Sequence, residues 1–169
     1  PFPYEEAKAL IESELGKPLS SVFPRFEKIP VASASVAQAH RARLPSGREV
    51  IVKVQRPNIE ETINTDIEIL MRLAGIFERL ILQSETLDAV SILEEFGKSL
   101  NREIDFYNEA MHIEKFAANF EGNEDLIVPE VFRECSSKRV LTMEFIDGTH
   151  VSEMAKLKRR TGKIEQSDD

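Results

Sequence analysis

Four charged side chains of this 169-residue chain have the types and spacing for a phosphate site, in which a lysine binds the phosphate groups and a carboxylate positions the lysine. Lys53 stands between valines in the β-branched run "EVIVKVQ", and Glu103, Asp105 and Glu109 follow in "NREIDFYNEA". Because strand side chains alternate between faces, Lys53 is expected to project from one face of a sheet and its two valine neighbours from the other. A lysine in a partly buried cleft stays charged when a carboxylate pairs with it, a part that either Glu109 or Glu103 could take.

Each of these residues also has a simpler interpretation. A single strand lysine commonly prevents edge-to-edge aggregation, and helix carboxylates are mostly solvated. Positions 105 and 109 share one helix face, whereas Glu103 lies across the helix from Asp105. The lysine–carboxylate hypothesis therefore depends on the elements that bring these segments together.

A loop that could cover phosphates precedes the strand of Lys53. It has the sequence "VASAS" and comprises Val31, Ala32, Ser33, Ala34 and Ser35. Phosphate loops usually carry glycine, because a backbone without Cβ comes closest to the oxygens. This loop has none, although its serine hydroxyls can donate to phosphate oxygens. Without its surroundings, the segment would equally suit a plain turn of small residues.

The elements that must position these residues follow from periodicity and turn signals. Residues 1–25 contain an amphipathic helix ended by Gly16, and strands are predicted between 26 and 55, the last two joined as a hairpin by "PSGR". Long helices at 58–82 and 87–120 follow, and then two strands within 126–145. A tight loop, "IDGTH", which the resemblance described below makes part of a hinge at 143–148, follows the last strand. Residues 151–169, either the start of a truncated second lobe or a frayed tail, come after it.

This order matches the small lobe of a protein kinase, which the prediction places at residues 26–150. The predicted fold is α+β, with a five-stranded antiparallel sheet, a long inserted helix after the third strand, and a long helix in the position of kinase helix αC. That lobe has a loop over phosphates, a lysine on its third strand and a helix carboxylate that holds the lysine.

Composition narrows the function classes. The net charge of -8 and the pI near 5.1 argue against a nucleic-acid-binding surface, and no apolar run is long enough to span a bilayer. Cys135 is the only cysteine, which excludes a disulfide framework and favours a reducing compartment. His40, His112 and His150 lack metal-ligand spacing, so no metal site is predicted on this chain.

Four segments resemble the UbiB family of atypical kinase-like proteins, called ADCK in animals and associated with isoprenoid quinone (coenzyme Q) biology. They are "ELGKPLSSVF", "IPVASASVAQAHRARLPSGREVIVKVQRP", "EIDFYNEA" and "VLTMEFIDG", in family order. The resemblance implies that the whole protein binds ATP or ADP with Mg²⁺ and acts as an atypical phosphotransferase or ATPase. It also implies that the alanine-rich loop favours ADP, since methyl groups narrow the space beneath the loop and restrict its backbone.

The resemblance further implies roles for single residues. Lys53 would contact the α- and β-phosphates, and Glu109 would be the helix glutamate paired with it. Glu103 and Asp105 match the family's Glu-x-Asp motif, which resembles a docking point for a family-specific N-terminal helical extension. The hinge, whose backbone would hydrogen-bond adenine, would comprise Met143, Glu144 and Phe145.

Other family features are expected outside this chain. The Lys-x-Gly-Gln motif is expected upstream, and the catalytic loop and the Asp-Phe-Gly site, which hold Mg²⁺, downstream. The chain is therefore interpreted as a small lobe, inactive alone, in a cytoplasmic or membrane-associated parent. Its expected partners are the nucleotide, the absent large lobe, the N-terminal extension, and quinone-pathway proteins or lipid. The alternatives are a nucleotide-binding pseudokinase that acts as scaffold or chaperone, and a helical interaction module that binds no nucleotide.

Overall fold

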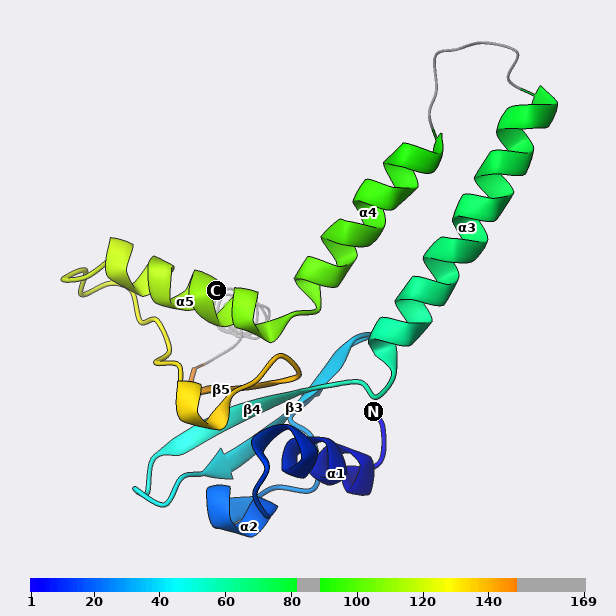
Figure 1. Ribbon diagram of the computed structural model, residues 1–169. Coiled ribbons are helices and arrows are strands. Elements are labelled where there is room, and N and C mark those ends of the chain that lie inside the picture. The colour runs from blue at the N-terminus through cyan, green and yellow to red at the C-terminus, as the bar shows by residue number, and fades with distance from the viewer. Residues whose placement is uncertain (82–88, 149–169) are drawn as a thin grey trace, which may run out of the picture.

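The computed structural model describes residues 1–81 and 89–148, and a five-stranded antiparallel sheet lies at their centre (Figure 1). The strands lie in the order β1-β3-β4-β5, and β2 also pairs with β3. This sheet confirms the predicted α+β class. The strands are β1 (Arg25–Phe26), β2 (Ala32–Ser33), β3 (Ala37–Arg43), β4 (Glu49–Gln55) and β5 (Val140–Glu144).

The β3–β4 hairpin sets the position of Lys53. Its turn is closed by hydrogen bonds from Leu44 N to Arg48 O at 3.0 Å and from Gly47 N to Leu44 O at 2.9 Å. Gly47 has a φ of 90°, which a residue without Cβ adopts without strain. The resulting register places Lys53 opposite Ala39, in the middle of the sheet.

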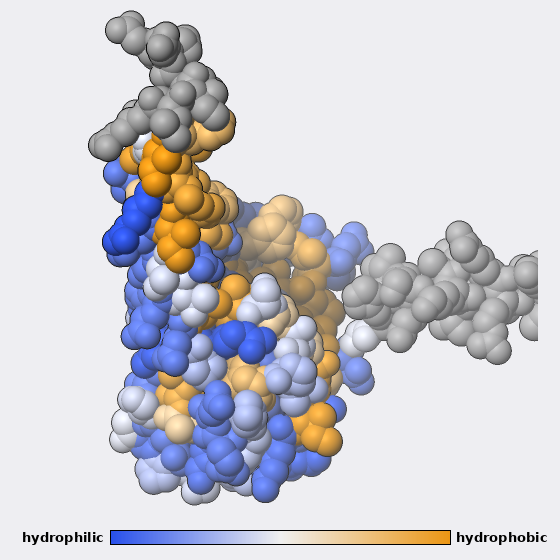
Figure 2. Space-filling view, turned by 90° about the vertical axis from the view of Figure 1, so that its right-hand side faces the viewer, coloured by the Kyte–Doolittle hydropathy of each residue, from blue (hydrophilic) through white to orange (hydrophobic). Residues whose placement is uncertain are grey.

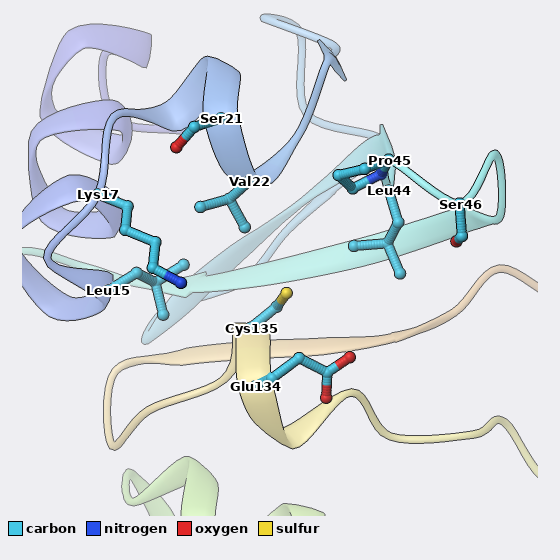
Figure 3. Close-up of a pocket in the computed structure, with 9 residues that line it drawn as sticks. All are labelled: Leu15, Lys17, Ser21, Val22, Leu44, Pro45, Ser46, Glu134 and Cys135. Carbon is cyan, nitrogen blue, oxygen red and sulfur yellow. The ribbon is translucent and has the colours of Figure 1, made fainter.

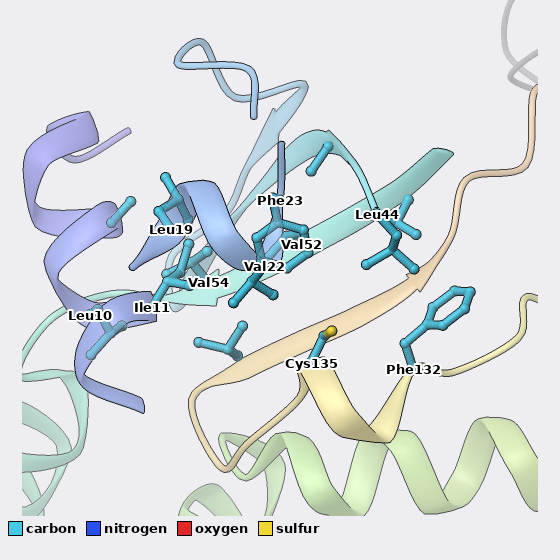
Figure 4. Packing of buried hydrophobic residues seen from close by; sticks show 14 of the residues in the cluster. Leu10, Ile11, Leu19, Val22, Phe23, Leu44, Val52, Val54, Phe132 and Cys135 are labelled. Atoms are coloured by element: carbon cyan, nitrogen blue, oxygen red, sulfur yellow. The ribbon is translucent and has the colours of Figure 1, made fainter. Parts of the chain in front are cut away.

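Helices α1 (Tyr4–Leu15) and α2 (Leu19–Val22) cover one face of this sheet. Gly16 ends α1 in the left-handed region, with a φ of 64°, as the sequence predicts. Figure 4 shows the apolar cluster that fills the space between these helices, β4 and the 3₁₀ helix η1 (Arg133–Cys135). Its central members are Leu10, Ile11, Leu19, Val22, Phe23, Leu44, Val50, Val52, Val54, Phe132, Cys135 and Val140.

The opposite face of the sheet is covered by α5 (Phe106–Asn119). Phe106 and Ala110 of this helix are buried against Ala37 and Leu141 of the sheet. Because β4 side chains alternate, its valines enter the first cluster while Lys53 faces α5. The two faces therefore separate a mainly apolar core, in which Gln38, His40 and Thr142 are also buried, from the surface that carries the charged candidate residues.

Helices α3 (Ile59–Ile81) and α4 (Ala89–Glu103) form an antiparallel pair that extends away from the sheet (Figure 1). The two helices pack closely where Gly97 meets Ile67; a Cβ on Gly97 would lie 3.1 Å from the Ile67 side chain. Apolar side chains remain exposed on the outer part of this pair, as Figure 2 shows. They are Ile69, Leu70, Leu73, Ile76, Phe77, Ile92 and Phe96.

The predicted helix at 87–120 is wrong in one respect, because the structure divides it into α4 and α5. Asp105 is the N-cap of α5 and accepts a hydrogen bond from Tyr107 N at 2.9 Å. The last turn of α4 is satisfied from outside the helix, by a 2.7 Å bond from Gln55 Nε2 to Ile104 O, and Phe106 N donates to Lys138 O. The break is therefore stabilised by both a local cap and tertiary hydrogen bonds.

Two predicted strand segments also differ from the structure. Residues 26–35 contribute only the two-residue strands β1 and β2, and residues 126–135 contain an isolated bridge at Val131 and the helix η1 in place of a strand. Prolines interrupt both segments and remove a ladder donor, as Pro30 and Pro129 illustrate. The predicted tail at 151–169 lies outside the described residues, whereas the predicted hinge at 143–148 lies within them. No helix in the described part of the chain is long and apolar enough to cross a membrane.

Candidate functional site

Lys53 and Glu109 form an ion pair between the sheet and α5. Lys53 Nζ donates to Glu109 Oε1 at 2.8 Å and to Oε2 at 2.6 Å. The lysine side chain is 30% exposed and the glutamate 33%, so the pair lies in a partly open cleft. Of the two acids that the sequence offers for this pairing, the structure places Glu109 against the lysine.

Phe106, in the same turn of α5 as Glu109, makes a second contact to Lys53. The Lys53 ammonium lies 4.9 Å from the centre of the Phe106 ring, within the range of a cation–π contact. Phe106 is itself buried against Leu141 and Ala37, so its ring cannot turn away. Lys53 is thereby fixed by a carboxylate and an aromatic face before any ligand arrives.

The "VASAS" segment comprises β2 and the start of the turn into β3, and it lines the same cavity as Lys53. Val31 N donates to Ala39 O and Ala34 N donates to Ala37 O, both at 2.8 Å, which closes the turn. Beneath it lies a cavity of about 210 Å³. The cavity is lined by Ala32, Ser33, Ala34, Val36, Ala37, Gln38, Ala39 and Lys53.

Arg56 clamps this turn from outside, a contact that the sequence analysis did not anticipate. Its backbone N–H donates to Val36 O at 2.8 Å, and its guanidinium donates to Ser35 O at 2.8 Å and to Ala34 O at 3.4 Å. Three consecutive carbonyls are thus held by one residue. The only sequence signal is an arginine directly after the Lys53 strand, in "VQRP"; the partners lie about twenty positions upstream and follow from the hairpin register.

Glu103 and Asp105 lie on either side of the break between α4 and α5. Asp105 uses one carboxylate oxygen to cap α5, so its first role is local. Glu103 lines a groove of about 190 Å³ that also reaches Glu109. Arg102, Asn108, His112 and Ile113 line the rest of the groove. Of all its lining residues, the sequence analysis proposed a site role only for Glu103 and Glu109.

The predicted hinge residues lie at the end of β5, and their backbone donors are already occupied. Glu144 N donates to Glu130 O at 2.8 Å, and Phe145 N donates to Glu49 O at 3.1 Å. Met143 pairs with Ile51 in the ladder between β4 and β5. The N–H groups of Glu144 and Phe145 are therefore already used within the protein. That the hinge backbone hydrogen-bonds adenine stays a prediction, for which the carbonyls of this segment offer acceptors.

The next residue offers a backbone donor. In the part of the chain that the structure describes, Ile146 is the first residue after β5 whose N–H makes no hydrogen bond with the protein. Its side chain is 38% exposed, at the edge of the site. A ligand ring at this edge that accepts a hydrogen bond could receive it from Ile146 N. Ring N–H groups could donate to the carbonyls of the preceding residues.

Charged side chains brace the hinge from the β3–β4 hairpin. The Arg41 guanidinium lies 4.1 Å from the centre of the Phe145 ring, and its Nε donates to Glu49 Oε2 at 3.2 Å. Hydrogen bonds from Arg43 and Arg41 hold the pKa of Glu49 below its usual value, so this carboxylate stays charged. The end of β5 is consequently tied to β4 through side chains as well as backbone.

The residues present fit a phosphate-bearing ligand with an aromatic ring. Small side chains leave the cavity under the turn open, the Lys53 ammonium lies at its floor, and Ser33 and Ser35 carry hydroxyl donors at the turn. Within the described ranges, no group of three or more His, Cys, Asp or Glu converges as a metal site would require.

Together, the antiparallel sheet, the strand lysine paired with a helix glutamate, and the turn above them define a protein-kinase-like small lobe. Comparison with known proteins agrees. A family model described as "ABC1 atypical kinase-like domain" matches residues 1–167. The chain therefore belongs to the ABC1 family of atypical kinase-like proteins.

Curated relatives point to the UbiB type within this family. The chain is 43% identical over 158 residues to "Probable protein kinase UbiB" of Pseudomonas paraeruginosa, covering 94% of the chain and 30% of the relative. It is 42% identical over 160 residues to the protein of that name from Aliivibrio fischeri, covering 94% and 29%. The chain thus spans about 30% of the length of these relatives.

A solved structure shares the fold. It is that of Rv3197 from Mycobacterium tuberculosis in complex with erythromycin, with a TM-score of 0.77 and 29% sequence identity. The match covers 92% of this chain and 39% of the mycobacterial chain. The sheet and helices described above are therefore a shared architecture within a larger protein.

Proposed function

We propose that this chain is the adenine-nucleotide-binding small lobe of a UbiB-type atypical kinase-like ATPase or phosphotransferase. The observation that carries the proposal is the Lys53–Glu109 pair at 2.6 and 2.8 Å, positioned below the turn of residues 31–35. Lys53 would bind the α- and β-phosphates, and Glu109 would orient its ammonium. Ile146 N would donate to the adenine ring, in place of the amides of Glu144 and Phe145.

The alanine and serine turn supports a preference for ADP. The clamp by Arg56 limits how far the turn can lift, and the Cβ atoms of Ala32 and Ala34 occupy space that a glycine turn leaves open. A third phosphate needs more room and more backbone donors than this turn supplies. Its two serine hydroxyls would contribute the remaining hydrogen bonds to phosphate oxygens.

Mg²⁺ would accompany the nucleotide and neutralise phosphate charge, held by residues outside this chain. The chain's own residues would bind and orient the nucleotide and would not transfer phosphate alone. We also propose, from the resemblance to the UbiB family, that the parent protein acts in isoprenoid quinone biosynthesis or lipid homeostasis. The 43% identity to "Probable protein kinase UbiB" supports the family on which this proposal rests.

A titration of Mg-ADP and Mg-ATP into the full-length parent protein tests the proposal. Lys53→Ala should weaken binding of both nucleotides, because it removes the cation under the turn. Lys115→Ala, on the exposed surface of α5, is the matched control and should leave binding unchanged. Ala34→Gly should shift the preference from ADP toward ATP. Nucleotide binding that is absent, or unaltered by Lys53→Ala, would overturn the proposed function.

A scaffold function without turnover is the second candidate, and the exposed apolar side chains of the α3–α4 pair favour it. Ile69, Leu73 and Phe77 lie on α3 and Ile92 and Phe96 on α4, all more than half exposed. Such a surface is typical of helices that pack against another protein. Mg-dependent ATP hydrolysis by the full-length protein, abolished by Lys53→Ala, distinguishes the enzyme from the scaffold.

A further inference from the structure

A second cavity lies on the face of the sheet opposite Lys53, and the proposed function makes no use of it. Its volume is about 310 Å³, which is at the lower end of the range for small-molecule sites. The loop after α1, helix α2, the β3–β4 turn and η1 surround it (Figure 3). Its lining includes Lys17, Val22, Leu44, Ser46, Glu134 and Cys135.

The middle of this cavity is apolar. In Figure 3, the side chains of Val22 and Leu44 and the sulfur of Cys135 converge on it. All three belong to the buried cluster, and Figure 4 shows the same residues from the side of the core. The cavity is therefore an opening onto the core, which water fills at a cost and an apolar group would fill with a gain.

One cation is available at this cavity. Lys17 extends toward it from the loop after α1 and, among the described residues, has no carboxylate within ion-pair distance. Glu134 lines the same cavity from η1 and likewise forms no ion pair with described residues. An anionic group beside Lys17 would complete a pair, while Glu134 would repel a second negative charge on the same ligand.

We propose that this cavity binds a small apolar monocarboxylic acid, with its hydrocarbon body on Val22, Leu44 and Cys135 and its carboxylate beside Lys17. The volume admits a ring or a short chain, and the single available cation selects one negative charge. A nucleotide is excluded by its several charges and by the apolar floor. The site is spatially separate from the nucleotide site, because the sheet lies between Lys17 and Lys53.

Occupancy of this cavity would reach the hinge through the covalent chain. Leu44 and Ser46 belong to the turn that joins β3 to β4, and Cys135 precedes β5, the strand that leads into the hinge. A ligand that bridges these segments would hold the two strands on which the nucleotide site is built. The acid is therefore expected to stabilise the small lobe as well as to bind it.

Cys135 reports on occupancy, since its sulfur lies at the cavity floor. The full-length parent protein is treated with iodoacetamide, and alkylation of the Cys135 peptide is followed by mass spectrometry. Burial raises the pKa of this thiol, and the thiolate is the form that reacts, so the reaction is run at about pH 8.5. At about 10 mM of a ligand with a Kd of about 1 mM, roughly a tenth of the sites stay free and alkylation slows about tenfold.

The probes are 4-phenylbutyrate, 4-phenylbutanol and 4-phenylbutylamine, which share a body and differ in charge. We expect the acid to protect Cys135 most and the amine least. Lys17→Gln should remove the advantage of the acid over the alcohol, Lys17→Arg should retain it, and Lys115→Gln should leave it unchanged. Lys53→Ala should also leave it unchanged, which separates this proposal from the nucleotide site.

Equal protection by the acid and the alcohol in the unmodified protein, or an advantage of the acid over the alcohol that persists in Lys17→Gln, would overturn the proposal. Isothermal titration calorimetry with 4-phenylbutyrate is the second measurement, for the case that Cys135 resists alkylation in the folded protein. There, saturable heat that is lost in Lys17→Gln and kept in Lys17→Arg supports the site. The absence of saturable heat in the unmodified protein refutes it.

Discussion

Glu109→Gln is the most direct test of the Lys53–Glu109 pair, because glutamine keeps the size of the side chain and removes its charge. The oxygens of Glu109 accept hydrogen bonds from Lys53 at 2.8 and 2.6 Å, and the two side chains are 30% and 33% exposed. The pair thus falls between an exposed pair, worth up to about 1 kcal/mol, and a buried one, whose disruption costs about 3–5 kcal/mol.

We expect Glu109→Gln to cost about 1–2 kcal/mol of nucleotide binding free energy, which corresponds to a Kd about 5–30-fold higher. The loss arises because Lys53 is no longer oriented toward the phosphates. The assay is isothermal titration calorimetry of Mg-ADP into the full-length parent protein. Lys53→Ala and the double variant complete a cycle, in which Glu109→Gln should add little once Lys53 is gone.

Glu114→Gln on the same helix is the matched control. Glu114 accepts two hydrogen bonds from Arg133 at 2.7 and 2.6 Å, a pair of similar geometry that lies away from the loop cavity. It should change the Kd by less than about twofold. The reasoning is refuted if Glu109→Gln leaves the Kd within that range, or if Glu114→Gln weakens binding as much.

Four further predictions concern other parts of the molecule. Arg56→Ala should speed amide hydrogen exchange of residues 34–37 and raise the nucleotide Kd about 3–10-fold, because three carbonyls lose their donors; unchanged exchange would contradict the clamp. Ile146→Pro should weaken adenine nucleotide binding, whereas Ile146→Ala, which keeps the N–H, should not; equal effects of the two would exclude this donor. Burial lowers the pKa of His40, so stability is present above the unfolded pKa of about 6.5 and is lost as pH falls through that value toward the lower folded pKa. Urea denaturation between pH 5 and 8 should therefore show an acid limb that is flatter in His40→Gln. Gly75→Ala should raise the free energy of unfolding by about 0.5–1 kcal/mol, since nothing lies near the position that its new Cβ would take. The free energy of unfolding of Gly97→Ala should be at least about 1 kcal/mol lower than that of Gly75→Ala, because the new Cβ would crowd Ile67. Equal thermal shifts of the two variants would contradict the close packing of α3 on α4.

Local patterns determined much of this fold. The end of α1 at Gly16, the β3–β4 hairpin, and the isolation of Lys53 on one face all follow from turn chemistry and side-chain alternation over a few residues. The strand and helix order was enough to indicate a kinase-like small lobe. A signal for the break after α4 was also present, since Asp105 is a preferred N-cap residue.

Other features were decided by packing between distant segments. Glu109 lies 56 positions from Lys53, and its selection over Glu103 depends on the direction of α5 after the break. That direction is set by two hydrogen bonds, one from Phe106 N to Lys138 O and one from Gln55 Nε2 to Ile104 O. No local sequence pattern encodes either of them. Periodicity alone continued the helix through this point because the apolar spacing does not change there.

The hinge and the second cavity show the same division. The sequence identified Met143, Glu144 and Phe145 as a hinge, but which N–H groups are occupied depended on the carbonyls of Glu130 and Glu49. The cavity beside Lys17 exists only because α1, the β3–β4 turn and η1 leave a gap over the core. Sequence specifies the chemistry that each residue can perform, whereas tertiary packing determines which groups meet, since hydrogen bonds and voids depend on distances that periodicity does not constrain.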